Sequence, residues 1–234
     1  MTAALFDGLA LADVHASLVR NIVSLRISQD LFDDLSSDPQ HQRSAIALER
    51  TTKPAPFVSA QPVIDRPFEE ARWNDAIGYP FKHWMQSRYS DGTFGVWYGA
   101  DTLETSVHET VHHWRAGLLR DAGYNQAGIV IQRKVYDVRC DAALVDLRQK
   151  LASYPALIAS DDYTLTHQVG AKLHHEGHPG LLARSARWPS GEIAAILNPG
   201  VLTGPQLSCF LTYRTTASGV DVERTPGAVL FSLN

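Results

Sequence analysis

Short strand patterns separated by turns fill most of the chain after residue 90, and they constrain the fold more than any other feature. Each is a brief run of alternating or β-branched apolar residues, and only two longer stretches have helical spacing. The expected strands cover 93–100, 127–138, 180–187, 192–198 and 208–216, with a further short strand and turn in 141–149, and the expected helices cover 102–119 and 161–177. Strands and helices do not alternate as βαβ units would. The sequence therefore predicts an α+β fold, with short mixed strands and flanking helices.

The first part of the chain is predicted to be a helical extension. Apolar residues recur at helical spacing toward residue 50, at Leu18, Ile22, Leu25, Leu31 and Leu35. Four prolines then interrupt the stretch from Thr51 to Pro67, which is typical of a connector. We therefore expect a helical N-terminal extension with its connector over residues 1–65, and a larger second domain over residues 66–234.

Composition and charge narrow the class of protein. The 234 residues carry a formal net charge of −4 with a pI near 6.2, so no basic surface indicates direct nucleic-acid binding. Cys140 and Cys209 form no CxxC motif or disulfide framework, which favours a reducing compartment. The N-terminus lacks the leading positive charge of a signal peptide, and no apolar run is long enough to span a membrane. We expect a cytoplasmic protein.

The helix expected at 102–119 begins at a capping signal. Asp101 is the expected N-cap, and Glu104, three residues later, completes a capping box. One face of this helix is apolar and carries Leu103, Val107, Val111, Trp114 and Leu118. Glu109 lies off that face, where a glutamate is by default a solvated side chain.

His108, Glu109 and His112 form an HExxH pattern on this helix. In zinc proteases the two histidines of this pattern bind the metal and the glutamate acts as general base. A catalytic zinc needs a third protein ligand. However, Arg115 and Leu118 occupy the positions where one known continuation has a glycine and a histidine. The motif alone is therefore an incomplete metal site.

A second histidine cluster, HHEGH at residues 174–178, is the remaining source of a third ligand. It contains Glu176, the first glutamate after Glu109, but its spacing matches no known zinc pattern. Histidines at a helix end also have an ordinary explanation, because they interact favourably with the helix dipole. A zinc-dependent hydrolase that uses the HETVH motif stays as the alternative reading.

Three polar residues follow one another at regular spacing in the stretch that leads into this helix. Arg88 precedes an SDG turn, Tyr98 lies at the expected strand 10 residues later, and Glu109 follows after another 11 residues. Ser185 comes late in the chain, within GLLARSAR at 180–187. Taken singly, these are a loop arginine, a core aromatic, a helix-surface glutamate and an unremarkable serine. Their order and the sequence between them carry the inference.

The stretch SRYSDGTFGVWYGADTLETSVHETVHH, together with GLLARSAR, resembles the RES domain family, named for an arginine, a glutamate and a serine. The resemblance runs from about residue 85 to 205 and places the family's arginine, tyrosine, glutamate and serine at Arg88, Tyr98, Glu109 and Ser185. An earlier family arginine corresponds to Arg26, in SLRIS. The resemblance implies an ADP-ribosyltransferase-like catalytic domain over residues 66–234.

The same resemblance implies a toxin of a toxin–antitoxin pair. Such proteins consume NAD by phosphorolysis or hydrolysis, or transfer ADP-ribose to a protein. The implied partner is an Xre-type antitoxin that blocks the NAD pocket and carries the DNA-binding portion, so the toxin would touch nucleic acid only through it. The acceptor of ADP-ribose stays open among phosphate, water and a protein side chain, because it depends on access to the pocket.

The chemistry of NAD cleavage suits these residue types. Breaking the nicotinamide–ribose bond passes through an oxocarbenium-like cation, which Glu109 would stabilise. The guanidinium of Arg88 suits the NAD pyrophosphate, and the Tyr98 ring would pack on nicotinamide. Ser185 would hydrogen-bond the ribose or the nicotinamide amide, with Arg187 as a second phosphate contact. NAD is then a substrate, and no metal is required. A non-enzymatic reading, a helical adaptor that binds a partner, also remains.

Overall fold

The computed structural model describes residues 3–24, 72–120, 123 and 126–234, and combines one mixed sheet with helices on its surface. The strands are β1 (Ala10–Val23), β2 (Trp97–Ala100), β3 (Val130–Asp146), β4 (Gly180–Arg184), β5 (Glu192–Ile196), β6 (Leu202–Thr215), β7 (Val220–Thr225) and β8 (Ala228–Leu233). The helices are α1 (Ala3–Phe6), α4 (Tyr79–Lys82), α5 (Leu103–His112) and α6 (Thr164–His175), with π-helical turns η1 (Asn74–Gly78) and η2 (His113–Leu119) and 3-10 turns η3 (Arg148–Lys150), η4 (Pro155–Ile158) and η5 (Pro199–Val201). This arrangement confirms the predicted α+β class.

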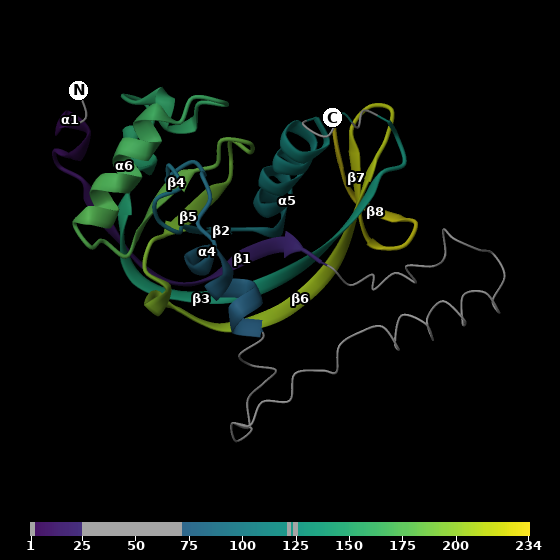
Figure 1. Cartoon of the computed structure of the whole chain (residues 1–234), viewed down its shortest axis with the longest axis horizontal. Helices are drawn as coiled ribbons and strands as arrows, with labels where there is room; N and C mark the ends of the chain where they lie inside the picture. The colour runs from purple at the N-terminus through teal and green to yellow at the C-terminus, as the bar shows by residue number, and fades with distance from the viewer. Residues whose placement is uncertain (1–2, 25–71, 121–122, 124–125) are drawn as a thin grey trace, which may run out of the picture.

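Five of the strands close into a ring. The sheet order is β1-β2-β5-β4-β3-β6-β7-β8, and β1 also pairs with β3, so that β1, β2, β5, β4 and β3 follow one another around a circuit. The pairing between β1 and β2 is the shortest in the ring, with the single residue pair of Val19 opposite Ala100. β3 and β6 are long and curved, and β7 and β8 extend the sheet beyond the ring (Figure 1).

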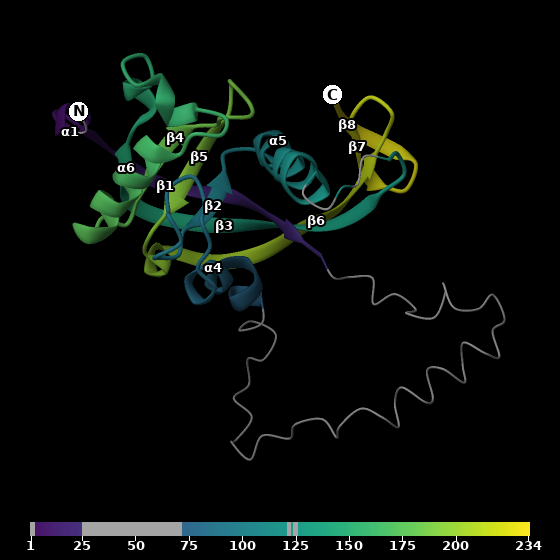
Figure 2. The ribbon, with the colours of Figure 1, turned by 45° about the horizontal axis from the view of Figure 1, so that its top comes forward.

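Helices α5 and α6 lie on the same side of the long strands β3 and β6 (Figures 1 and 2). Val107 and Val111 of α5, with Trp114 of the following turn η2, pack against a core cluster that includes Leu211 and Tyr213 of β6. This confirms the predicted apolar face for these three residues, and the side chain of Leu118 lies outside the described residues. α6 packs through Val169 and Leu173 on a separate cluster under β4 and β5.

In the described N-terminal residues the helical prediction holds only for the short helix α1 (Ala3–Phe6) and is wrong for residues 10–23. Residues 10–23 form β1, which pairs with β3 along its full length, from Ala10 opposite Asp146 to Val23 opposite Arg133. The spacing of Leu18 and Ile22 does not distinguish the two structures, because residues four apart lie on one face of a strand as well as on one face of a helix. Residues 25–71, including the Thr51–Pro67 connector and the predicted domain boundary at 65, lie outside the described residues.

The start of α5 also differs from the expectation. Its N-cap is Thr102, not Asp101, because the Thr102 hydroxyl accepts a hydrogen bond from the Thr105 backbone N–H at 3.1 Å. After His112 the chain continues as the π-helical turn η2 up to Leu119, so the helical segment matches the predicted length. The sequence pattern predicts no element after residue 216, where β7 and β8 form.

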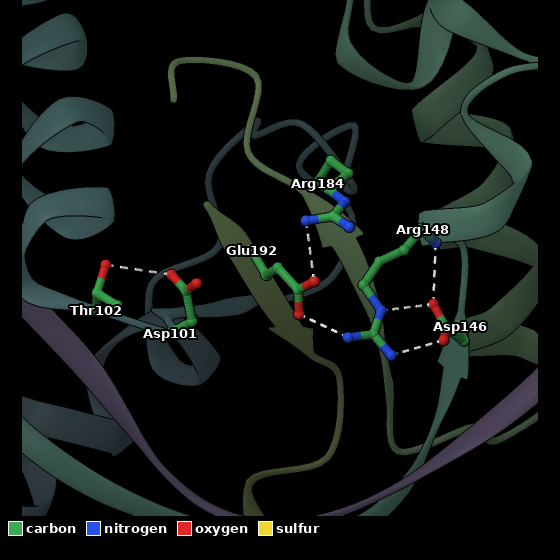
Figure 3. A network of polar contacts seen from close by, with 6 residues as sticks. All are labelled: Asp101, Thr102, Asp146, Arg148, Arg184 and Glu192. Carbon is green, nitrogen blue, oxygen red and sulfur yellow. Dashed lines mark hydrogen bonds and ion pairs between the residues drawn. The ribbon is translucent and has the colours of Figure 1, made fainter. Parts of the chain in front are cut away.

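A network of ion pairs joins the ends of three ring strands (Figure 3). Arg148 binds Asp146, at the end of β3, through two nitrogens at 2.9 and 2.7 Å, and binds Glu192 of β5 at 2.6 Å. Arg184 of β4 reaches the other oxygen of Glu192 at 3.1 Å. Every charge in this network has an opposite partner, so it stabilises the closure of the ring. Within the described part of the chain, no helix is long and apolar enough to cross a membrane.

Candidate active site

A cavity of about 180 Å³ lies where β1, β2 and α5 meet the segment around Arg88. Polar and aromatic side chains line it, among them Arg20, Arg88, Tyr98, Glu109, His113 and Tyr163. The structure therefore brings together three of the predicted site residues, Arg88, Tyr98 and Glu109, from a loop, a strand and a helix. Glu109 is the one carboxylate among the residues that line this cavity.

Glu109 is held in place by Ser185. The Ser185 hydroxyl donates a hydrogen bond of 2.6 Å to one carboxylate oxygen of Glu109. The same hydroxyl oxygen accepts from the backbone N–H groups of Arg187 at 3.1 Å and Trp188 at 3.0 Å, and Ser185 is only 2% exposed. The serine therefore sits behind the carboxylate and orients it, and it is not among the residues that line the cavity.

Arg88 lines the cavity but bonds to η4 and to the residue that follows it. Its guanidinium donates to the carbonyl oxygens of Ala159 at 2.9 Å and Leu157 at 3.4 Å. It also lies 4.7 Å from the ring centroid of Tyr163, within range of a cation–π contact. The positive charge of Arg88 is thus met by carbonyl dipoles and a ring face, and its contacts tie the loop that carries Tyr163 to the cavity.

Tyr98 presents its ring to the cavity while its hydroxyl is fully engaged behind it. The hydroxyl accepts from the Tyr89 backbone N–H at 2.9 Å and shares a hydrogen bond of 2.9 Å with Ser87. Burial raises the pKa of Tyr98 to about 12, so the phenol is neutral at physiological pH. Tyr98 can therefore contribute a rigid apolar ring face, and it is not poised to act as an acid or base.

Arg20 is the site residue that sequence reasoning missed. It projects from β1, donates to the carbonyl oxygen of Tyr98 at 2.9 Å and lies 5.5 Å from the ring centroid of Trp97. Its Nε is buried without a hydrogen-bond partner. Burial, with help from the nearby positive charge of Arg133, lowers the pKa of Arg20 to about 10, so it stays charged.

The signal that could have found Arg20 was the β-branched character of residues 10–23, which the helical interpretation overrode. Tyr163 was missed for a different reason. It follows an irregular segment whose position beside Arg88 has no local sequence signature. Arg26, the predicted earlier arginine, lies outside the described residues.

Arg187 lies beside the site and is bonded to a loop. Its guanidinium donates to the carbonyl oxygen of Ser160 at 2.8 Å, and its Nε is buried without a partner. It is not among the residues that line the cavity. The positive charge of Arg187 still acts on a neighbouring residue of the site. Burial is the main cause that lowers the pKa of His112, and the charge of Arg187 lowers it further.

The HExxH histidines do not form a metal site in the part of the chain that the structure describes. His108 stacks on the indole of Trp188, with ring centroids 4.3 Å apart and planes at 14°. No group of three His, Cys, Asp or Glu side chains is placed to hold a metal among the described residues. His174 of the HHEGH cluster instead stacks on Phe94 at 4.3 Å. The zinc alternative has no support from this geometry.

A match to a protein-family model agrees with the motif that runs through this site. The model of the RES domain matches residues 58–214. No curated protein matches the chain. Among solved structures, the chain is similar to a chain in the crystal structure of the M. tuberculosis MbcT–MbcA toxin–antitoxin complex. The sequence identity is 12% and the TM-score 0.44, over 93% of this chain and 92% of that chain.

Proposed function

The chain belongs to the RES domain family, and from this premise we propose that it is an NAD-consuming toxin of a toxin–antitoxin pair. It cleaves the bond between nicotinamide and ribose. The ADP-ribose then passes to phosphate, to water or to a protein side chain. The enzyme is thus an NAD phosphorylase, a glycohydrolase or an ADP-ribosyltransferase, and its core is related to that of ADP-ribosyltransferases.

One observation carries this proposal: a single carboxylate and an incompletely bonded arginine line the same cavity. Glu109 supplies the negative charge, and Arg20 supplies a half-buried guanidinium whose Nε is buried without a partner. A buried cation without an anion is costly unless a ligand completes it. NAD offers matching groups, because its pyrophosphate is anionic and its ribose becomes cationic as nicotinamide leaves.

The reaction follows from this distribution of charge. The electron pair of the C1′–N bond goes to nicotinamide, which leaves as a neutral molecule, and positive charge develops on the ribose. Glu109, oriented by Ser185, stabilises that cation without a metal. The acceptor oxygen then forms the new bond to C1′; an acceptor that carries a proton on that oxygen, such as water, releases the proton to the solvent. Ser185 acts in this scheme through Glu109 and does not itself contact the substrate.

The remaining residues bind and orient NAD. The neutral ring of Tyr98 packs against nicotinamide, and Tyr163 offers a second aromatic wall. Arg20 and Arg88 take the pyrophosphate, for which Arg88 exchanges carbonyl partners for phosphate oxygens. Arg187 would contribute a second phosphate contact only after releasing the carbonyl of Ser160.

We also propose the cellular setting that the family resemblance implies. An Xre-type antitoxin covers the NAD cavity, and its own DNA-binding portion provides the only contact with nucleic acid. The net charge of −4 supports the absence of direct binding to nucleic acid. We place the pair in the cytoplasm, where both NAD and a reducing environment for Cys140 and Cys209 are present.

The test is to incubate the purified chain with NAD labelled in its ADP-ribose part, alone, with phosphate and with cell lysate. Mass spectrometry of the products identifies where the label goes. We expect Glu109→Gln and Arg88→Ala to abolish nicotinamide release and growth inhibition while circular dichroism stays that of the folded protein. Glu104→Gln is the matched control, since Glu104 is on the same helix but does not line the cavity.

Two results would contradict the proposal. Intact NAD under all three conditions would remove the function itself. Undiminished cleavage by both Glu109→Gln and Arg88→Ala would leave the function standing but remove the site. Zinc bound stoichiometrically and lost on His108→Ala would instead favour the hydrolase alternative.

A further inference from the structure

A chain of buried hydrogen bonds runs beneath α5 and ends beside Glu109. The hydroxyl of Tyr213, on β6, lies 2.8 Å from the Thr110 hydroxyl on α5. The side-chain amide of Asn21, on β1, donates to the same Tyr213 oxygen at 2.8 Å. Tyr213 is fully buried. The three residues therefore connect the helix that carries Glu109 to two strands of the sheet.

Arg133 of β3 anchors the far end of this chain. Its Nε donates to the Asn21 side-chain oxygen at 2.9 Å, and its Nη2 donates to the Asn21 carbonyl at 2.8 Å. The guanidinium also lies 5.7 Å from the centroid of the Tyr213 ring. Arg133 is only 7% exposed, and no ion pair is recorded for it within the described residues. Two nitrogens of the charged Arg133 guanidinium therefore donate to Asn21, the next member of the hydrogen-bond chain.

The donors and acceptors in this chain have one consistent direction. Thr110 donates its own hydroxyl hydrogen to the Ser106 carbonyl at 2.7 Å. Tyr213 must then donate to Thr110, and it accepts from Asn21, which in turn accepts from Arg133. Hydrogen bonds arranged in this way strengthen one another in a low-dielectric interior. The result is an unbroken path from a buried cation to the residue next to Glu109.

Apolar packing alone would not fix the rotation of α5. Val107 and Val111 press the helix onto the core, but hydrophobic contact is non-directional. Immediately after His112 the helix changes to the wider π-helical turn η2, so regular hydrogen bonding does not continue on that side. A directional contact at Thr110 therefore supplies what the packing does not.

We propose that Tyr213 is a positioning residue: its hydroxyl, oriented by Asn21 and Arg133, holds α5 in the rotation that turns Glu109 toward the cavity. This inference rests on the proposed NAD-consuming function, since it assigns Tyr213 to the same reaction. Tyr213 acts through the helix and does not contact the substrate.

The test is Tyr213→Phe, which removes the hydroxyl and keeps the ring. Tyr136→Phe is the matched control, because Tyr136 is also buried but belongs to a core cluster that contains no residue of α5. We expect kcat for NAD consumption to fall about 10- to 100-fold in Tyr213→Phe, as for a catalytic group misplaced by about 1 Å. KM should change less than about twofold, because no NAD-binding group is altered. Tyr136→Phe should match the wild type.

A double variant separates positioning from general loss of structure. In a Ser185→Ala background, where Glu109 has already lost the hydrogen bond that orients it, Tyr213→Phe should cause a smaller proportional loss of kcat than in the wild type. An equal proportional loss in both backgrounds would overturn the proposal, as would an unchanged kcat in Tyr213→Phe. If Tyr213→Phe does not fold, Thr110→Val removes the other end of the same bond and should lower kcat to a similar extent; KM is not compared for this variant, because Thr110 also lines the cavity. A wild-type chain that leaves NAD intact would instead refute the proposed function.

Discussion

Arg148 and Arg20 differ in whether the protein neutralises the positive charge of the arginine. Arg148 makes three hydrogen bonds to the carboxylates of Asp146 and Glu192, and Figure 3 shows the guanidinium enclosed by them. Arg20 makes one hydrogen bond to a carbonyl oxygen and faces the Trp97 ring, and no ion pair is recorded for it within the described residues. The first charge is neutralised by the protein, and the second is not.

The pKa directions of the two arginines reflect the same difference. The hydrogen bonds to Asp146 raise the pKa of Arg148, whereas burial lowers the pKa of Arg20 to about 10. A neutralised arginine is one that the fold uses for its own stability. An arginine left partly bonded at a cavity weakens the fold slightly, and this cost is consistent with a residue kept for an anionic ligand. The comparison therefore predicts which substitutions cost activity and which cost stability.

Arg20→Met is expected to have the largest effect of this kind, and on activity alone. Losing a charge-assisted contact worth about 1.5–3 kcal/mol should raise KM for NAD about 10- to 100-fold, with a smaller change in kcat. Tm should stay the same or rise, because a buried cation without a counter-ion has been removed. Steady-state NAD consumption and thermal unfolding measure the two quantities.

Arg20→Lys sharpens this experiment. Lysine keeps the charge but loses the planar fork, so we expect KM to lie between those of the wild type and Arg20→Met. A clear fall in Tm for Arg20→Met, with KM unchanged, would place Arg20 in the same structural class as Arg148 and remove the contrast between them.

Arg20 also shows which parts of the candidate site can be predicted from the sequence and which cannot. Arg88, Tyr98 and Glu109 lie within a short stretch whose strand, turn and helix are set by local patterns, and the cavity unites them as predicted. Arg20 comes from a strand whose partner, β3, begins more than one hundred residues later. Pairing over that separation has no local signature, so the helical interpretation went unchallenged.

The role of Ser185 was missed for a similar reason. The family resemblance predicts that Ser185 contacts the substrate, whereas in the structure its hydroxyl bonds to Glu109, 76 positions away in the chain. The residue type and its position in the motif were identifiable from sequence. The partner was not, because it depends on how β4 docks beside α5. The same limit applies to the path from Arg133 to Thr110, which draws on four separate elements.

Arg148→Met tests the other side of the comparison, with a moderate effect on stability. Asp146, which is 8% exposed, would be left without its cation. We expect a loss of about 2 kcal/mol and a fall in Tm of about 4–8 °C at neutral pH, with NAD consumption unchanged at temperatures where the variant is folded. Arg139→Met is the control, since its pair with Asp141 is solvent-exposed and should contribute little to stability.

This difference in Tm should depend on pH. The hydrogen bond from Arg148 lowers the pKa of Asp146 below its ordinary value of 3.8. A lowered pKa means that the pair stabilises the folded protein above about pH 4 and that this contribution is lost as the pH falls through the pKa of the folded state. The gap in Tm between wild type and Arg148→Met should therefore shrink below about pH 4. A gap that is constant with pH would show that Arg148 stabilises the protein through packing.

Tyr89→Phe is expected to have the smallest effect. It tests whether an unpaired buried group affects activity only when it lines the cavity. The Tyr89 hydroxyl is buried without a partner, like the Nε of Arg20, but Tyr89 does not line the cavity. Removing an unsatisfied buried hydroxyl should be neutral or slightly stabilising, within about 1 kcal/mol. NAD consumption should not change, because the bond from Tyr89 to Tyr98 comes from the backbone N–H. A large loss of activity would mean that an unpaired buried group can affect NAD consumption even when it does not line the cavity. Lining the cavity would then not distinguish residues kept for activity from the others.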